Sequence, residues 1–209
     1  METEEASVSI IITGSISTGK TGLAYYLTGD PRKPSETTIA NKLIKINYNF
    51  HNQSIVLDFW DTNGLEQAIC SVGFTIKVAH SKYKVILFVY EIHEKDKFME
   101  LDHRLQELSP FMSNECVKIL VANSFRSEPP VVSREEGEEK AKMYGMHYFE
   151  TNLLTGEGTK ELLDQIVLLA FSSKKEDNPP KDQNKDKPSK EQKSRRQKMQ
   201  KRQEACVVQ

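Results

Sequence analysis

The chain has 209 residues, of which 37% are apolar and 28% charged, with a mean hydropathy of −0.57 and a formal net charge of −1. This composition suits one globular domain with a polar appendage, and because no run of 18 apolar residues occurs, it excludes a protein that spans a membrane by helices. The three cysteines, Cys70, Cys116 and Cys206, form no CxxC pair, which excludes a disulfide scaffold and a thiolate zinc site. Because nothing at the N-terminus resembles a signal peptide, we expect the chain to lie in the reducing cytosol.

The charge is divided unevenly along the chain. Residues 173–209 carry 12 Lys and Arg against 6 Asp and Glu, whereas residues 1–172 carry 17 basic and 24 acidic side chains. The C-terminal segment is therefore strongly basic and the rest of the chain is acidic. This division predicts that only the C-terminal segment binds an anionic partner.

Strand and helix patterns alternate in the first part of the chain, as they do in a layered α/β domain. Apolar runs predict strands, and two adjacent strand patterns predict a hairpin. A helix is predicted before Gly29 and Pro31, which end it. These elements are the strand Val8–Ile12, the helix Thr21–Leu27, and the hairpin of Lys42–Phe50 with Ser54–Trp60, with His51, Asn52 and Gln53 as its turn.

The same alternation continues to residue 172. Further strands are expected at Val85–Tyr90, Val117–Ala122 and Met146–Thr151. A helix is expected where apolar residues recur every three or four positions, at Phe98, Leu101, Leu105 and Leu108, and Pro110 ends it. Ser133 and Glu136 form a capping box that opens a helix through Tyr144, which Gly145 ends, and Thr159–Phe171 is an amphipathic helix.

The composition changes completely after Ser172. Residues 174–204 contain almost no large apolar side chain, so burial cannot offset the entropy cost of ordering them. We therefore expect an N-terminal tail over residues 1–6, a folded domain over residues 7–172 and a disordered polybasic tail over residues 173–209.

A phosphate-binding motif lies between the first predicted strand and helix. The segment Gly14-Ser15-Ile16-Ser17-Thr18-Gly19-Lys20-Thr21 fits GxxxxGK[ST] in full. In such a loop the backbone N–H groups and the helix N-terminus surround the phosphates, Lys20 reaches the terminal phosphates and the Thr21 hydroxyl binds magnesium. Glycine is needed where the backbone approaches the phosphates with no side chain between. The motif alone leaves kinase, ATPase and GTPase open.

Two further segments narrow this choice. Asp58-Phe-Trp-Asp61-Thr-Asn-Gly64-Leu-Glu66 resembles the WDTAGQE segment of the Rab branch of Ras-like small GTPases, and Thr37-Thr38-Ile39 resembles the switch Thr-Ile of that family. The order of elements over residues 7–172 is similar to the same fold. The resemblance implies the α/β small G-protein fold of P-loop NTPases, a mostly parallel six-stranded sheet with helices on both faces, which binds GTP or GDP and Mg²⁺.

The resemblance also implies roles for single residues. Asp61 is expected to be the metal-associated carboxylate, Thr38 the switch threonine on magnesium, and Gly64 the hinge that senses the γ-phosphate. Thr37 is an alternative to Thr38. Trp60 is either core filler or an effector contact, and an effector protein is expected to bind through the switch regions.

Two departures from the family pattern concern hydrolysis. The family has a water-orienting Gln directly after the position of Gly64, where this chain has Leu65, which neither donates nor accepts a hydrogen bond. Ile16 occupies a phosphate-loop position that is usually Gly or Ser, and its branched side chain is expected to crowd the space through which an arginine finger enters. We therefore expect no confident catalytic residue and impaired hydrolysis, with or without a partner.

Another departure concerns the base. The guanine-reading NKxD of the family corresponds to Asn123-Ser-Phe-Arg126, so the Asp that accepts from the base is replaced by Arg126, which only donates. The loss of charged hydrogen bonds is expected to weaken guanine binding by about tenfold to a hundredfold or more. Glu128 is the alternative acceptor. The ETSAK element corresponds to Glu150-Thr-Asn-Leu-Leu154, where only a backbone N–H, that of Leu153, is expected to read the base.

The chain ends in Cys206-Val-Val-Gln209, a CaaX sequence that favours farnesyl transfer to Cys206 by a prenyltransferase. Residues 190–202, shortly before it, contain one acid, Glu191, and seven basic residues: Lys190, Lys193, Arg195, Arg196, Lys198, Lys201 and Arg202. A single lipid chain with a basic segment makes a usable anchor on an anionic membrane surface. The alternatives are a solubilising tail, a nuclear-import run or an RNA-binding run.

Three functional hypotheses follow. The first is a Rab- or Ras-like switch in vesicle traffic or signalling, tethered to the cytoplasmic face of the plasma membrane or an endomembrane, that binds GTP but hydrolyses it poorly. The second is a pseudo-GTPase scaffold or interaction protein that has lost guanine specificity. The third is a P-loop phosphotransferase, which the lack of a lid-like run of arginines disfavours. We expect a monomer that binds no nucleic acid.

Overall fold

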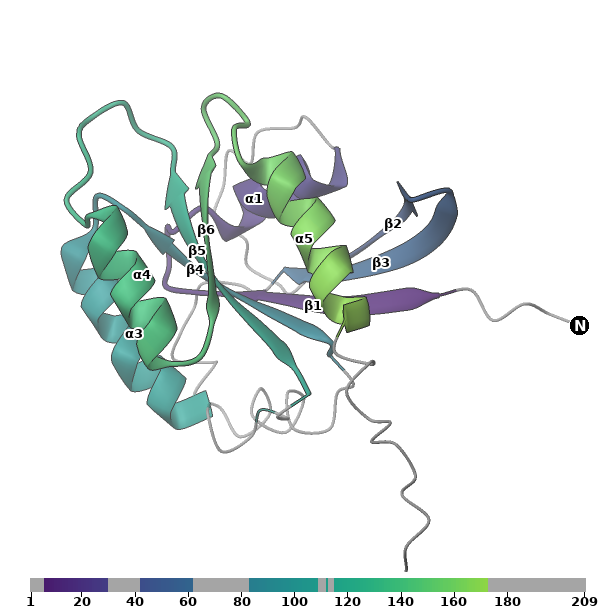
Figure 1. The fold of residues 1–209 in the computed structure, drawn as a ribbon. Helices are drawn as coiled ribbons and strands as arrows, with labels where there is room; N and C mark the ends of the chain where they lie inside the picture. Colours follow the sequence, from purple (N-terminus) through teal and green to yellow (C-terminus); the bar gives the residue numbers. More distant parts are fainter. Residues whose placement is uncertain (1–5, 30–41, 62–82, 109–111, 113–114, 173–209) are drawn as a thin grey trace, which may run out of the picture. The chain divides into compact units, whose positions relative to one another are not determined.

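A computed structural model of the chain describes residues 6–29, 42–61, 83–108, 112 and 115–172. These residues form one six-stranded sheet in the order β2-β3-β1-β4-β5-β6 (Figure 1). Only the β2–β3 pair is antiparallel, and the other four neighbouring pairs are parallel. The strands are β1 (Ser7–Thr13), β2 (Lys42–Phe50), β3 (Gln53–Asp61), β4 (Val85–Glu91), β5 (Val117–Ser124) and β6 (His147–Asn152). The predicted fold class, a mostly parallel six-stranded sheet, is confirmed.

Helices cover both faces of this sheet, as predicted. Within the described residues they are α1 (Lys20–Thr28), α3 (Lys95–Leu108), α4 (Arg134–Met143) and α5 (Thr159–Ser172). One core cluster joins the sheet to α1 and α5, and a second joins its other face to α3 and α4 (Figure 1). Successive residues of β1 point to opposite faces, so Ile10 and Ile12 enter the first cluster and Ile11 enters the second. The central strands β1, β4 and β5 are therefore buried on both sides, which explains their continuous apolar runs.

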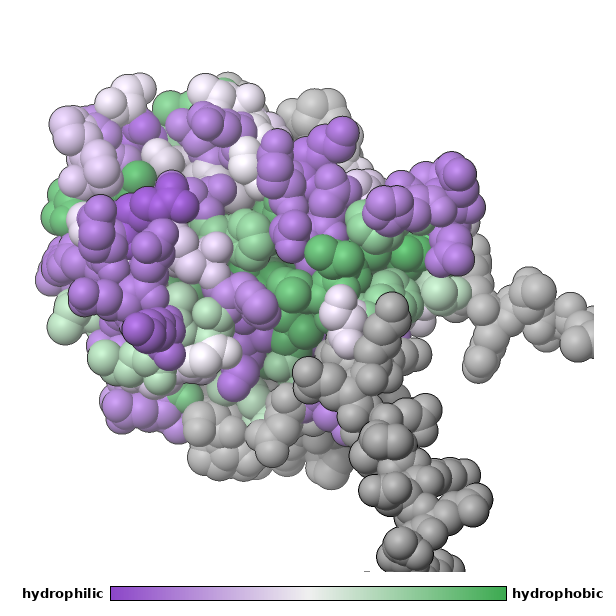
Figure 2. Space-filling model, in the orientation of Figure 1, coloured by the Kyte–Doolittle hydropathy of each residue, from purple (hydrophilic) through white to green (hydrophobic). Residues whose placement is uncertain are grey.

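The two sides of the domain differ in how much apolar surface they expose. Figure 2 shows apolar residues around α5 and the neighbouring strands, and mainly hydrophilic residues over α3 and α4. The partly buried apolar residues here include Ile44 and Ile46 of β2 and Leu169 of α5, and Leu168 of α5 is 45% exposed. Among the described residues, no helix combines the length and the apolar character needed to cross a membrane.

The β2–β3 hairpin corrects one detail of the sequence prediction. Its turn has two residues, His51 and Asn52, with φ of 49° and 63°. Gln53, which was expected in the turn, pairs with Phe50 as the first residue of β3. A two-residue turn with both residues at positive φ matches the right-handed twist of the flanking strands, and this geometry favours the shorter turn.

The start of α4 agrees with the sequence prediction. The Ser133 hydroxyl accepts from the Glu136 N–H, and the Glu136 carboxylate accepts from the Ser133 N–H, which completes the predicted capping box. The helix ends one residue earlier than predicted, at Met143, with Tyr144 as its C-cap, and Gly145 follows at a φ of 61°.

The parallel strands bring four loops to one edge of the sheet. The segments that follow β1, β4, β5 and β6 all leave from the carboxyl ends of their strands, where ligands bind in open α/β sheets. The phosphate-binding motif follows β1, and the altered base-reading motifs follow β5 and β6. The predicted roles of Thr37, Thr38, Gly64, Leu65 and Cys206, and of the tail over residues 173–209, lie outside the described residues.

Candidate functional site

The phosphate-binding motif forms a compact loop between β1 and α1. Gly14 has a φ of 151°, and a Cβ atom there would lie 2.0 Å from the carbonyl oxygen of Val89 in β4. Gly19 has a φ of 81°, and a Cβ atom there would lie 2.3 Å from Nδ2 of Asn123 in β5. Both glycines are therefore required by packing against the neighbouring strands, in addition to the phosphate approach for which the motif predicts them.

The Lys20 side chain folds back across this loop. Its ammonium group donates to the carbonyl oxygen of Gly14 at 2.8 Å and to that of Ser15 at 2.6 Å, and the residue is 5% exposed. The Thr18 hydroxyl donates to the Ser15 carbonyl oxygen at 2.9 Å. Ser17 has a φ of 60°, an unusual conformation for a residue with a side chain. The loop thus holds a buried cation at the place where the motif requires one.

Two of the three side chains predicted to bind magnesium, those of Thr21 and Asp61, come together beside the loop. Thr21 lies in the first turn of α1 and Asp61 ends β3, and the Thr21 hydroxyl donates to the Asp61 Oδ2 at 2.7 Å. Asp61 is fully buried. Hydroxyl and carboxylate oxygens are the ligands that Mg²⁺ prefers, so these residues fit such an ion.

The remaining loop residues point in different directions. Ile16 is 38% exposed, so its apolar side chain is presented at the surface of the loop. Ser15 is 1% exposed, and its hydroxyl donates to a carboxylate oxygen of Glu100 in α3 at 3.3 Å. Glu100 was not predicted as a neighbour of the loop, because it lies in the exposed part of a helical pattern far along the chain.

Asn123 connects the phosphate loop to the base-side strands. Its Nδ2 donates to the Thr18 carbonyl oxygen at 2.9 Å, and its Oδ1 accepts from the Thr151 hydroxyl of β6 at 3.1 Å. The residue is fully buried. Asn123 therefore has a structural function in addition to the nucleotide contact that the sequence predicts for it.

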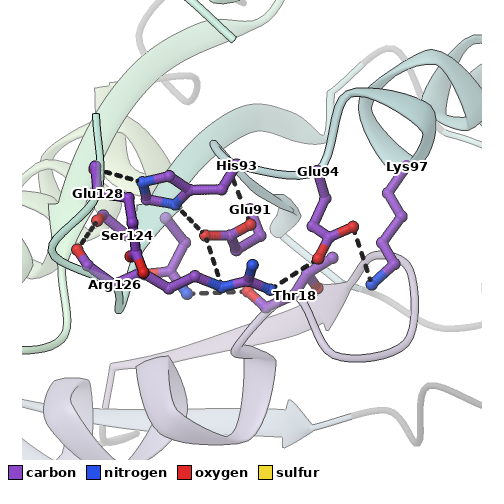
Figure 3. A network of polar contacts seen from close by, with 9 residues as sticks. Thr18, Glu91, His93, Glu94, Lys97, Ser124, Arg126 and Glu128 are labelled. Carbon is purple, nitrogen blue, oxygen red and sulfur yellow. Dashed lines mark hydrogen bonds and ion pairs between the residues drawn. The ribbon is translucent and has the colours of Figure 1, made fainter. Parts of the chain in front are cut away.

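Arg126 is directed towards acidic residues at the end of β4 and in the turn that follows it (Figure 3). Its Nη2 donates to Glu94 Oε1 at 2.7 Å, and its Nε lies 3.8 Å from Glu91 Oε1. The hydrogen bond from Arg126 lowers the pKa of Glu94, and the same bond raises the pKa of Arg126. Sequence reasoning missed both glutamates. The signal for Glu91 is its position directly after the predicted strand Val85–Tyr90, where it ends β4 beside Asn123 of β5.

Leu153 has both of its backbone polar groups engaged. Its N–H donates to the Ser124 carbonyl oxygen at 2.7 Å, and its carbonyl oxygen accepts from the Tyr26 hydroxyl at 2.7 Å. A base that accepts from this N–H has to compete with Ser124. Glu128, the alternative acceptor, has an exposed side chain, and its backbone carbonyl oxygen lies 2.7 Å from Nε2 of His93.

Comparison with known proteins agrees with this geometry. The model of the Ras family matches residues 9–171. The chain is similar to the Ras-related protein Rab-18 of Caenorhabditis elegans, with 26% identity over 167 residues, which are 77% of this chain and 80% of that protein. It is 27% identical to the mouse Ras-related protein Rab-26 over 159 residues, or 73% of this chain and 58% of that protein. It is 26% identical to the Ras-related protein RABA5d of Arabidopsis thaliana over 168 residues, or 78% of this chain and 74% of that protein.

Proposed function

The chain belongs to the Ras family of small GTPases, near the Rab branch, and on this premise we propose that it is a membrane-tethered nucleotide switch that hydrolyses GTP slowly. Members of this family bind guanine nucleotide. In this chain the nucleotide is held mainly through its phosphates, and the preference for guanine is weaker than in the family.

The observation that carries this proposal is the arrangement of Lys20, Thr21 and Asp61. Lys20 supplies a cation over the phosphate loop, and the Thr21 hydroxyl meets the Asp61 carboxylate at 2.7 Å. We propose that Thr21 and Asp61 hold Mg²⁺ together with Thr38, and that the ion neutralises phosphate charge when bound. The loop amides and Lys20 bind the phosphates, and none of these contacts depends on the base.

The base-side residues support the weaker guanine preference. Guanine presents an N1–H and an exocyclic amine, which need an acceptor, whereas position 126 carries a guanidinium group that is already bound to Glu94. Asn123 and the Leu153 N–H remain as base contacts, and both also bind protein groups. The remaining interactions at this end of the nucleotide therefore discriminate little between bases.

A purification experiment tests the nucleotide proposal. The full chain is purified in buffer with Mg²⁺, denatured, and the released nucleotides are identified by mass spectrometry. We expect bound nucleoside di- or triphosphate, and we expect chelation of Mg²⁺ to accelerate its loss. A chain that carries no nucleotide and binds none when GTP is added supports the alternative, a pseudo-GTPase scaffold, which the ion pair of Arg126 favours.

Slow hydrolysis follows from two positions. Leu65 supplies no hydrogen bond for the attacking water, and Ile16, which is 38% exposed, occupies the approach of an arginine finger. In single-turnover assays we expect very slow hydrolysis by the unmodified chain and a faster rate for Leu65→Gln. Stimulation by a partner is expected only when Ile16→Gly is added. Fast hydrolysis by the unmodified chain contradicts this placement of Leu65.

The C-terminal sequence supports the tether. Prenylation of Cys206 and the seven basic residues before it supply the two signals that stable membrane anchoring needs. In prenylating cells we expect the chain in the membrane fraction and Cys206→Ser in the soluble fraction. An unmodified chain that stays soluble, or a Ser variant that stays bound, contradicts the tether.

A further inference from the structure

Both ring nitrogens of His93 face oxygen acceptors (Figure 3). Nδ1 lies 2.5 Å from Glu91 Oε1, and Nε2 lies 2.7 Å from the backbone carbonyl oxygen of Glu128. A carboxylate and a carbonyl group only accept hydrogen bonds, and a neutral imidazole has only one N–H to donate. The geometry is therefore fully satisfied only by the imidazolium form of His93, which donates from both nitrogens.

The surroundings of His93 stabilise this positive charge. Its side chain is 5% exposed and that of Glu91 is fully buried, so the two form a nearly dry ion pair. The other Glu91 oxygen, Oε2, accepts from the His93 N–H at 3.0 Å. A buried carboxylate without a cationic partner is strongly disfavoured. Glu91 has two such partners, His93 and Arg126, whose Nε lies 3.8 Å from Glu91 Oε1.

His93 holds the end of β5 and the segment that follows it, which we call the base-side loop and define as residues 124–132. The Ile92 carbonyl oxygen accepts from the N–H groups of Val131 and Val132 at 3.0 and 2.8 Å. Arg126, near the start of this loop, binds Glu94. The His93 ring reaches the middle of the loop at Glu128. The turn between β4 and α3 thus fixes the loop at its start, middle and end.

We propose that protonated His93 is a positioning residue for the nucleotide, because it holds the base-side loop in place, and that loss of its proton releases the loop at Glu128 and speeds nucleotide dissociation. This inference rests on the proposed nucleotide binding. A neutral ring that keeps its bond to Glu91 has no donor left for the Glu128 carbonyl oxygen. The loop connects to the base side of the site in two ways: it carries Arg126, and the carbonyl oxygen of its first residue, Ser124, accepts from the Leu153 N–H.

The charges around the ring support this assignment. Burial lowers the pKa of His93, but the hydrogen bonds to Glu128 and Glu91 outweigh it, so the pKa lies above its ordinary value of 6.5. The charged groups that face the ring are Glu91 from β4 and Glu94 from the turn before α3, which favour its positive charge, and Arg126 from the base-side loop, which opposes it. Because folding raises the pKa of His93, the stabilisation that its charge gives to the folded loop is complete below pH 6.5. This stabilisation is lost as the pH rises through the pKa of His93 in the folded chain.

The test measures the dissociation rate of a fluorescent GTP analogue from the full chain between about pH 6 and about pH 8.5. We expect the rate of the unmodified chain to rise about tenfold across this range, with a midpoint above the ordinary histidine pKa. His93→Gln cannot carry the charge, so its rate should be high and nearly independent of pH. His147→Gln, which changes an exposed histidine of β6, should follow the unmodified chain.

Two outcomes overturn the inference while leaving nucleotide binding intact: a flat pH profile for the unmodified chain, or a His93→Gln profile that matches it. If the analogue binds at no pH, the proposed function itself fails and the inference fails with it. Because His93→Gln removes a buried contact, nitrogen NMR of the unmodified chain provides a measurement without substitution. Both ring nitrogens of His93 should carry protons near neutral pH, and a neutral ring there contradicts the inference.

Discussion

The phosphate side and the base side of the site are built in different ways. Lys20 and Thr18 bind carbonyl oxygens three to six positions earlier in the chain, so the phosphate loop is held largely by its own residues, with further bonds to Asn123 and Glu100. Arg126 instead binds Glu94, which is 32 positions away, and Asn123 binds Thr18, which is 105 positions away. A loop whose bonds are mostly local depends less on distant residues than one whose bonds are mostly long-range. The base side, which is assembled from separate loops, changes its partners when one residue is replaced.

Among the changes that test this difference between the two sides, removal of Lys20 is expected to have the largest effect on nucleotide affinity. Lys20→Ala deletes the buried cation of the phosphate loop, and loss of charge-assisted bonds to the phosphates should weaken binding of every nucleoside triphosphate about a thousandfold. Isothermal titration measures the affinities. Lys45→Ala, which removes a 59% exposed lysine of β2, is the matched control and should bind normally. A loss confined to GTP would show that the phosphate side depends on the base.

Replacement of Asn123 breaks the connection between the two sides. Asn123→Ala removes bonds to the Thr18 carbonyl oxygen and the Thr151 hydroxyl, both of which are buried. Unfolding in urea should show a loss of about 2 kcal/mol in the free energy of unfolding. Asn49→Ala, at an exposed position of β2, is the control and should change little. Equal stability of Asn123→Ala and the unmodified chain would contradict the structural function of Asn123.

Restoring a hydrogen-bond acceptor at position 126 tests whether the base side can regain its preference for guanine. Arg126→Asp combined with Glu94→Gln places a carboxylate at the family position without the charge of Glu94 beside it. The preference for GTP over ATP should rise about tenfold, as one charged hydrogen bond predicts. The control is Arg126→Ala with Glu94→Gln, which frees the same space but supplies no acceptor. If both double variants gain the same preference, the carboxylate is not its cause.

The smallest effect is expected at the start of α4, just after the base-side loop. Ser133→Ala removes the N-cap acceptor of this helix and should lower the free energy of unfolding by about 1 kcal/mol. Nucleotide affinity should stay the same, because the loop is fixed by Ile92, His93 and Glu94 rather than by the helix that follows it. Thermal melting together with a GTP titration measures both quantities, and a parallel loss of affinity would assign the positioning of the loop to α4.

The sequence was informative where the determining interactions are local. Apolar runs located the central strands, which are buried on both faces, and alternation located β2 at the edge of the sheet. The capping box at Ser133 is contained in four residues. The turn at Gln53 was placed one residue too long, because both turn lengths fit the same polar residues. The phosphate loop was identified in full for the same reason as the capping box.

The partners on the base side could not be predicted from sequence. Arg126 was recognised as a change from the family pattern, but its ion pair with Glu94 depends on which turn the fold places beside it. The role of His93 is not visible in the sequence, because nothing in its neighbours indicates that Glu128, 35 positions later, supplies its second acceptor. The Leu153 N–H was predicted as a base contact without its bond to Ser124 for the same reason.

The most direct test of the central claim is a titration of GTP, ATP and XTP against the purified full chain in the presence of Mg²⁺. If the phosphates dominate binding, the three affinities should lie within about tenfold of one another and be weaker than is usual for the family. A strong preference for GTP at nanomolar affinity would contradict the account, and would identify Glu128 as the acceptor that replaces the missing aspartate.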